Sequence, residues 1–430
     1  MWLGLLVTFG IIYGSLLPFE YRAATMHEAI YEYSHISWLD LGVESRADWV
    51  ANLVLYVPLG FFVCGSLGKR RLLVAIFLTT LIGAALSASV EFIQIWAAPR
   101  TVSLNDIVAE FVGTCLGITA WVLFGKRIVH YARLMSTNGP EAVRAAVILY
   151  VLVYCFVTLF PFDFLVSGSE IHDHLENSSL IVWVPRNLLS ARGILHILLK
   201  VSLMVPLGVA VRLIWQSNWF AAGLVAATLS GVLEIAHLFE FSQQTDAASV
   251  GAAAIGAMGG NIFAHSLDRY VRSSKSWLRQ LAIVATPFYL AILPVAYGWK
   301  FSHVGREQIE QTLATTRWLP FYYHYFTSEG NALASVVEIF ASFAPLGLLT
   351  WAVRYQPNQP AAHIRSLAPV ALTALLLSII LETGGLITAG HRPDPTNVLI
   401  AVVAAMLAKR GCEWLARVLA SIPGADWAAR

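Results

Sequence analysis

Long apolar segments recur along the whole chain, and they constrain its fold more than any other feature. Each is close to the roughly 20 residues that a helix needs to cross the hydrocarbon core of a bilayer. Because lipid offers no partners for backbone N–H and C=O groups, such segments must be helices. The sequence predicts twelve of them, at residues 2–18, 48–67, 72–96, 106–125, 143–162, 194–215, 218–240, 247–267, 277–297, 332–354, 366–388 and 396–415.

The composition agrees with a membrane protein and excludes other classes. Hydrophobic residues make up 57% of the chain and charged residues only 13%, whereas soluble domains are about 25% charged. This balance excludes an ordinary soluble enzyme, a disordered chain and a basic nucleic-acid binder. We therefore predict an all-α polytopic membrane protein whose partners are membrane lipids and not nucleic acid.

The distribution of basic residues predicts the orientation of the chain in the membrane. Eighteen of the 28 Lys and Arg residues lie in the loops after the even-numbered segments or in the C-terminal tail. Because such loops favour the cytoplasmic side, we expect both termini in the cytoplasm. The first segment has no basic region before it and no clear cleavage site after it, so we interpret it as a membrane helix and not as a removed signal peptide.

Five sequence landmarks recur three times in the same order, which predicts three tandem units, named here units 1, 2 and 3 (residues 1–135, 136–270 and 271–430). The first two landmarks are a proline pair ending the first helix (Leu17-Pro18, Phe160-Pro161, Leu293-Pro294) and a tryptophan in the next loop (Trp38, Trp183, Trp318). The others are a Pro-Leu-Gly in the second helix (Pro58 to Gly60, Pro206 to Gly208, Pro345 to Gly347), a glutamate ending the third (Glu91, Glu234, Glu382) and an aspartate opening the fourth (Asp106, Asp246, Asp394). Since four helices is an even number, we expect the units to lie parallel.

The proline of each Pro-Leu-Gly lies inside a helix, where it removes a backbone hydrogen bond and produces a kink. The following glycine lets a neighbouring helix approach closely. Because membrane helices tolerate proline, we interpret the element as a packing kink in preference to a hinge or a ligand site. Six residues before this proline stand Asn52 in unit 1 and Lys200 in unit 2.

Polar residues gather around the outer end of the third helix of unit 1. Ionisable residues within membrane helices mark functional sites by default. The sequence therefore predicts an outward-facing polar pocket there, formed by Asn52, Glu91, Gln94, Arg100, Ser103 and Asp106. Two structural explanations stay open. In the first, Glu91 pairs with Arg100 and Glu234 pairs with Lys200. In the second, the aspartates cap helices, above all Asp246 and Asp394.

The matching positions in the other units are less complete. They are Lys200, Glu234, His237 and Asp246 in unit 2, and Glu382, Arg392 and Asp394 in unit 3. We interpret unit 1 as the functional unit and the other two as partly degenerate. Phosphate-binding and hydrolase motifs are absent from the sequence, and Glu234-x-x-His237 lacks the second pair of a carboxylate-bridged iron site. We therefore expect no cofactor and no metal.

The residues of unit 1 resemble the VanZ-like family, which is named after a teicoplanin-resistance protein. The resemblance covers residues 1–125 and rests on Asn52, Tyr56-x-Pro58-Leu59-Gly60-Phe61, Glu91-x-x-Gln94, Arg100, Ser103-x-x-Asp106, Gly113 and Gly117. One position departs from the family, because Glu110 replaces an asparagine that is common one turn after the aspartate. Units 2 and 3 resemble the family more weakly. The resemblance implies a bacterial cell-envelope protein of the cytoplasmic membrane, linked to glycopeptide resistance or to exopolysaccharide and hence to lipid-linked glycans.

Three functions stay open at this point. The first is a non-enzymatic factor that binds an amphiphile at the outer leaflet, such as a lipid-linked glycan or a glycopeptide. The second is a transferase or hydrolase of lipid-linked glycans with Glu91 or Asp106 as general base. The third is a secondary transporter or flippase, which polar residues spread through the depth of the bilayer would favour. In this sequence they cluster at the outer end, and Lys200 is the main deeper one.

Overall fold

The protein is all-α apart from two very short strands. The computed structural model describes residues 2–39, 42–68, 71–137, 139–177, 181–182, 191–243, 245–272, 277–299, 304–355, 366–389 and 391–421. The helices of unit 1 are α1 (Trp2–Leu16), α2 (Met26–Ser34), α3 (Val43–Leu67), α4 (Leu72–Gln94) and α5 (Leu104–Met135). Those of unit 2 are α6 (Pro140–Thr158), α7 (Gly168–Asn177), α8 (Ala191–Trp215), α9 (Trp219–His237) and α10 (Ala247–Arg272). Unit 3 contains α11 (Trp277–Ala296), α12 (Arg306–Thr315), α13 (Tyr322–Tyr325), α14 (Glu329–Arg354), α15 (Ala368–Ala389) and α16 (Pro395–Ser421).

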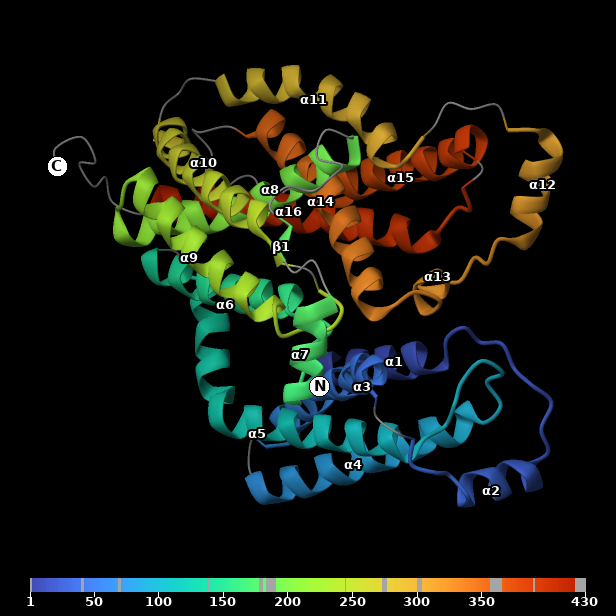
Figure 1. The fold of residues 1–430 in the computed structure, drawn as a ribbon. Helices are drawn as coiled ribbons and strands as arrows, with labels where there is room; N and C mark the ends of the chain where they lie inside the picture. Colours follow the sequence, from blue (N-terminus) through green and yellow to red (C-terminus); the bar gives the residue numbers. More distant parts are fainter. Residues whose placement is uncertain are drawn as a thin grey trace.

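All twelve predicted segments coincide with helices. Ten of the helices in the described residues are long and apolar enough to cross a membrane, which confirms an all-α polytopic membrane protein. The remaining two are α1, which is shorter, and α16, which carries charged residues from Lys409 to Arg417. The additional helices α2, α7, α12 and α13 are short and connect long helices in the chain, and α2 and α12 lie at the edge of the molecule (Figure 1).

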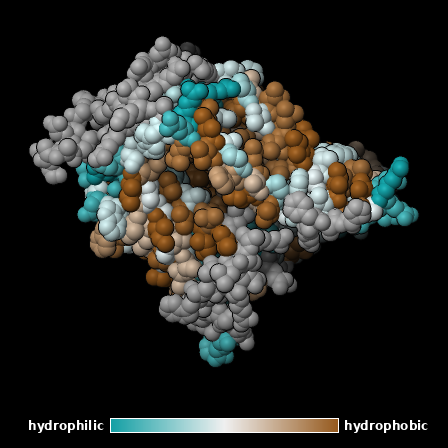
Figure 2. Space-filling model, turned by 90° about the horizontal axis from the view of Figure 1, so that it is seen from above, coloured by the Kyte–Doolittle hydropathy of each residue, from teal (hydrophilic) through white to brown (hydrophobic). Residues whose placement is uncertain are grey.

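The outer surface of the helix bundle is hydrophobic, as lipid requires. On α4, for example, Leu73 is 82% exposed and Phe77 67% exposed, whereas Ala75, Thr79 and Gly83 are buried on the opposite face. Figure 2 shows broad hydrophobic areas on one face of the molecule. Exposure of this extent would aggregate a soluble protein, so these side chains face lipid.

The same close helix pair occurs in each unit at the Pro-Leu-Gly element. Pro58, Pro206 and Pro345 all lie inside their helices, which are α3, α8 and α14. A Cβ added to the following glycine would collide with a backbone carbonyl of the unit's last helix: Gly60 with Thr114 of α5, Gly208 with Ala257 of α10, and Gly347 with Ala405 of α16. The interpretation of this element as a packing device for two helices fits these contacts.

The turn after the first helix corrects one landmark. Phe19 and Phe162, each following its proline, have φ values of 61° and 63°. In unit 3 the turn directly after α11 falls on Gly298, at φ 72°, whose amide donates to the carbonyl of Val295, three residues earlier, as the amides of Phe19 and Phe162 do. Pro294, which we predicted to end the first helix of unit 3, lies inside the last turn of α11, four residues before this turn. The proline pair of unit 3 therefore does not precede the turn directly, as it does in units 1 and 2, while Trp183 lies outside the described residues.

Two short β contacts join the ends of the helices in units 1 and 2. Tyr21 bridges Ala97 in unit 1, and Phe164 bridges Glu240 in unit 2, both antiparallel. The strands β1 (Ile181–Val182) and β2 (Thr245–Asp246) pair in parallel just before α10. These contacts fix the loops at those ends of α4 and α9 where Glu91 and Glu234 lie. We call this side of the molecule the glutamate end.

Candidate functional site

The glutamate of each unit contacts the backbone amide of the residue directly before the unit's last helix. Glu234 accepts a hydrogen bond of 2.8 Å from the amide of Asp246, and Glu382 accepts one of 3.0 Å from the amide of Asp394. In unit 1 the amide of Ser103 interacts with Glu91. Negative charge is favourable at a helix N-terminus, where amides lack intrahelical partners. Each glutamate therefore helps to fix the start of the next helix.

The aspartates do not occupy equivalent positions. Asp246 and Asp394 cap their helices, since their side chains accept hydrogen bonds from Ala248 N at 2.9 Å and Thr396 N at 2.8 Å. In unit 1 the cap is Ser103, and Asp106 lies one turn further on, within α5. The prediction that Asp106 matches the other two aspartates is therefore wrong by one helical turn.

Asn52 and Lys200 occupy matching places and contact the start of the following helix. Asn52 donates to Oδ1 of Asp106 at 2.8 Å, and Lys200 donates to Oδ2 of Asp246 at 2.7 Å and to Ser249 at 2.5 Å. The alternative pairing of Lys200 with Glu234 is wrong, because the ammonium group pairs with Asp246 instead.

Arg100 and Gln94 point toward the end of α1 and not into a pocket with the carboxylates. Arg100 donates to the carbonyls of Gly14 and Leu17, both at 3.1 Å, and lies 4.5 Å above the ring of Tyr325. Gln94 donates to the carbonyl of Ser15 at 2.8 Å. Within the described residues Arg100 forms no ion pair, so the alternative of a Glu91–Arg100 pair is wrong.

The predicted polar pocket of unit 1 is thus divided into two networks. One ties α1 to the loop after α4 through Gln94 and Arg100. The other joins Asn52, Asp106 and Ser103, whose hydroxyl donates to Oδ2 of Asp106 at 2.7 Å. Both oxygens of the Asp106 carboxylate are therefore occupied by donors.

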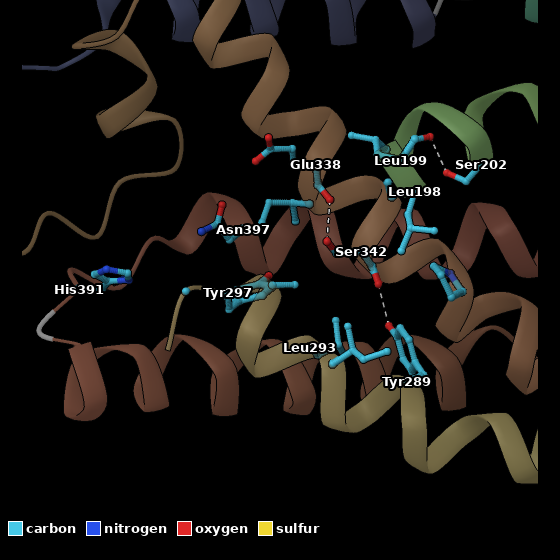
Figure 3. A pocket seen from close by; sticks show the side chains of 16 residues that line it. Leu198, Leu199, Ser202, Tyr289, Leu293, Tyr297, Glu338, Ser342, His391 and Asn397 are labelled. Carbon is cyan, nitrogen blue, oxygen red and sulfur yellow. Dashed lines mark hydrogen bonds between the residues drawn. The ribbon is translucent and has the colours of Figure 1, made fainter. Parts of the chain in front are cut away.

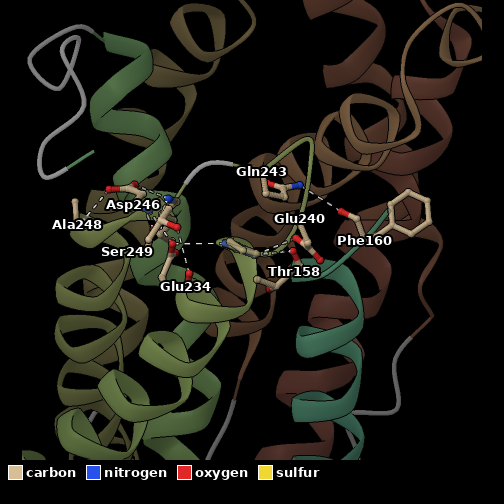
Figure 4. A network of polar contacts seen from close by, with 11 residues as sticks. Thr158, Phe160, Glu234, Glu240, Gln243, Asp246, Ala248 and Ser249 are labelled. Carbon is tan, nitrogen blue, oxygen red and sulfur yellow. Dashed lines mark hydrogen bonds and ion pairs between the residues drawn. The ribbon is translucent and has the colours of Figure 1, made fainter. Parts of the chain in front are cut away.

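Unit 2 has a histidine network at the same place (Figure 4). His237 lies 3.5 Å from Glu234, 3.1 Å from the carbonyl of Thr158 and 3.9 Å from Glu240. Glu240 is fully buried in the loop after α9, and neither of its carboxylate oxygens has a hydrogen-bond partner. Burial raises the pKa of Glu240 to about 7, with nearby Asp163 adding to the rise and His237 opposing it.

Unit 3 has a different arrangement. Glu382 is held at both oxygens, by the amide of Asp394 and by the side chain of Asn397 at 2.8 Å. Arg392 is exposed and, in the part of the chain that the structure describes, pairs with no carboxylate. The predicted member Arg392 therefore does not join Glu382 and Asp394.

Sequence analysis missed three residues that the structure brings together with Glu91. Glu110 of α5, Tyr56 of α3 and Ser87 of α4 are all buried beside one another. One signal could have found Ser87, because it precedes Glu91 by one helical turn and so shares its face of α4. Glu110 stood out only as a departure from the family pattern.

A cavity of about 490 Å³ opens between units 2 and 3 (Figure 3). Its walls come from α8, α11 and α14, together with His391 and Asn397 at the start of the last helix. Figure 3 shows Glu338, Asn397 and His391 toward one side of the cavity and Leu198 and Leu199 on the other. The cavity therefore has a polar end and an apolar wall.

The kink of α14 helps to form this cavity. Pro345 and Ala341 both line it, and a proline at position 345 leaves the Ala341 carbonyl without its helical donor. Ser342, which also lines the cavity, accepts a hydrogen bond of 2.8 Å from Tyr289. In unit 3 the Pro-Leu-Gly element thus adjoins this cavity as well as a helix contact.

Comparison with known proteins identifies one part of the chain. Residues 5–125 match the model of the VanZ/LLP1 family, so unit 1 contains a VanZ/LLP1 domain. No curated protein and no solved structure matches the chain. The family match stops before unit 2, where the sequence landmarks become less complete.

Proposed function

We propose that this membrane protein binds an amphiphilic component of the bacterial cell envelope, in the class of a lipid-linked glycan or a glycopeptide. The observation that carries the proposal is the cavity between α8, α11 and α14, which combines a polar end with an apolar wall. Its volume of about 490 Å³ lies within the range of small-ligand sites. The VanZ/LLP1 domain in residues 5–125 supports a role in the cell envelope.

The lining of the cavity suits such a ligand. At the polar end, Glu338 offers a carboxylate and His391 an imidazole, groups that bind the hydroxyl and amide groups of a saccharide or peptide. Tyr297 also lines the cavity, and its buried hydroxyl has no hydrogen-bond partner. The apolar wall, with Leu198, Ile292 and Leu293, suits a lipid chain.

The position of the polar end supports binding at the membrane surface. His391 and Asn397 lie at the glutamate end of the molecule, beside Glu382. We place this end at the outer face of the cytoplasmic membrane and both termini in the cytoplasm, because the opposite loops hold most of the basic residues.

An enzymatic role for Asp106 is less well supported. Both oxygens of Asp106 already accept a hydrogen bond, from Asn52 and from Ser103, which weakens Asp106 as a base for a substrate proton. We therefore favour binding over a hydrolysis or group transfer that uses Asp106.

The test compares two neighbouring substitutions in α11. Ala296 lines the cavity, whereas Val295 is 48% exposed and lies outside the lining. We expect Ala296→Phe to fill the cavity and Val295→Phe to leave it open. In native mass spectrometry of the purified protein, the wild type and Val295→Phe should retain a bound lipid-linked species that Ala296→Phe loses. Equal retention by all three proteins, or retention of bulk phospholipid alone by the wild type, would contradict the proposal.

A further inference from the structure

A row of buried polar side chains runs along one face of α4 in unit 1. Glu91, Ser87 and Thr79 follow one another at helical spacing, and Gly83 completes the row at the point where Thr114 of α5 packs. Twelve residues separate Glu91 from Thr79, which is about 18 Å at 1.5 Å per residue. The row therefore extends from the glutamate end deep into the membrane-spanning part of the helix.

Several polar atoms of this row, and of Tyr56 and Glu110 beside it, lack hydrogen-bond partners. They are the hydroxyls of Thr79, Ser87 and Tyr56 and one oxygen each of Glu91 and Glu110. The two glutamates are each only 2% exposed, and Tyr56 is fully buried. Because a buried polar group without a partner is unfavourable, this many of them in one place indicates a site that binds something polar.

The other two units supply an internal comparison. At the positions of Tyr56, Thr79, Glu110 and Thr114, unit 2 has Met204, Ala222, Ala253 and Ala257, and unit 3 has Phe343, Val370, Ala401 and Ala405. Those apolar residues are buried and form the hydrophobic clusters of their units. The helix packing therefore does not need polar groups at these four places, and unit 1 has them for another reason.

We propose that Glu91 and Glu110 bind one proton between them, and that this proton exchanges through water along Ser87, Thr114 and Thr79. Two carboxylates that share a buried site cannot both be ionised, so one of them holds a proton. In the exchange step the O–H bond of the protonated carboxyl breaks, its electron pair stays on the carboxylate, and the proton passes to a water molecule. Water in such a site needs two to four polar partners, which the unpaired groups of the row provide.

Other charged or titratable groups face the pair from each neighbouring element. They are Tyr33 of α2, Tyr56 of α3, Asp106 of α5 and Arg100 of the loop after α4. Asp106 is held by Asn52 and Ser103, and Arg100 is bound to the end of α1. Neither is therefore the member of the cluster that exchanges the proton.

Infrared spectroscopy of the protein in liposomes tests whether Glu91 and Glu110 hold a proton. The wild type should show the C=O stretching band of a protonated carboxylic acid at neutral pH, and Glu110→Ala, which copies Ala253 and Ala401, should remove or shift this band. A wild-type band that Glu110→Ala leaves unchanged would overturn the proposal. Loss of the band on adding Na⁺ at constant pH would overturn it as well, because the site would then bind a metal cation.

The proposed exchange path along Ser87, Thr114 and Thr79 is tested by the rate at which the carboxyl C=O band shifts after transfer to D₂O. We expect Thr79→Ala with Thr114→Ala, the residues found in unit 2, to slow the shift at least tenfold while the band itself remains. The matched control is Thr119→Ala, because Thr119 bonds the carbonyl four residues earlier as Thr114 does but is exposed. Unchanged exchange in the double variant would overturn the path. Amphiphile binding in the distant cavity is a separate readout, so either proposal can fail alone.

Discussion

Glu240 is a buried carboxyl group whose protonation makes the stability of the protein depend on pH. Its pKa of about 7 in the folded protein exceeds the ordinary value of 4.5, so the folded state binds more protons than the unfolded state between these values. Stability therefore falls as the pH rises from about 4.5 to about 7, by roughly 3 kcal/mol. We expect Glu240→Gln to remove this fall, measured by unfolding in detergent across that pH range.

The control for this experiment is Glu310→Gln. Glu310 lies on the exposed helix α12 and forms only a surface ion pair with Arg306, so its substitution should leave the pH dependence in place. If Glu240→Gln unfolds with the same pH dependence as the wild type, the carboxyl of Glu240 is ionised in the folded protein, and Glu240 is not the source of the effect.

At the scale of single residues, the sequence predicted which positions correspond between the units better than it predicted which groups their side chains contact. It correctly matched Asn52 with Lys200, because both precede a recognisable proline by the same spacing. It failed for Lys200 and Arg100, whose partners depend on contacts between helices and loops. Aligning the units by aspartate also hid the one-turn shift of Asp106, since Ser103 and Asp106 exchange roles with Asp246 and Ser249 in unit 2.

Among the helices, the closest contact of unit 1 joins α3 to α5 through glycine. A Cβ on Gly117 would collide with the carbonyl of Val57, and neither backbone can move alone because Pro58 and Gly60 lie next to the contact. We expect Gly117→Ala to force the two helices apart and to destabilise the protein by about 1–3 kcal/mol. Reversible unfolding in mixed detergent measures the loss.

A glycine without such a contact distinguishes packing from helix propensity. Gly231 of α9 has open space where a Cβ would lie, so Gly231→Ala should be neutral or stabilising by up to about 1 kcal/mol. If Gly117→Ala proved as harmless as Gly231→Ala, the close contact between α3 and α5 would not require glycine.

The long helices were predictable because lipid imposes length and apolarity on each of them. Every one of the twelve predicted segments is a helix, with ends that differ by up to ten residues, as at the end of α5, which was predicted at residue 125 and lies at Met135. The short helices α2, α7 and α12 were not predicted as elements, because they have no long apolar run. In α2 a local signal existed, since Thr25 and Glu28 form a capping box.

At the scale of the whole molecule, we propose that the three units are copies of one four-helix plan. The close helix pairs, the glutamate contacts and the turns at Phe19, Phe162 and Gly298 recur in each unit, which supports this proposal. The contacts between units were beyond prediction from sequence. Trp414 of α16 donates to the carbonyl of Met135 at 2.8 Å, and no local pattern relates residues so far apart in the chain.

The segment around α13 joins unit 3 to unit 1 at the glutamate end. Tyr322 donates to Glu20 at 2.7 Å, Tyr13 donates to the carbonyl of Pro320 at 2.8 Å, and Tyr325 donates to the carbonyl of Pro99 at 3.1 Å. The same segment lies over Arg100, whose guanidinium is 4.5 Å above the ring of Tyr325.

Removal of the Tyr325 ring should therefore loosen this junction. Tyr325→Leu loses both the cation–π contact and the hydrogen bond, together worth about 1–2 kcal/mol, so amide hydrogen exchange of α13 should accelerate roughly five- to thirtyfold. Tyr325→Phe keeps the ring and should show a smaller acceleration, while Tyr31→Leu, at a position 62% exposed on α2, should show none in α13. Equal exchange in Tyr325→Leu and the wild type would mean that Tyr322 and Tyr13 suffice to hold unit 3 against unit 1.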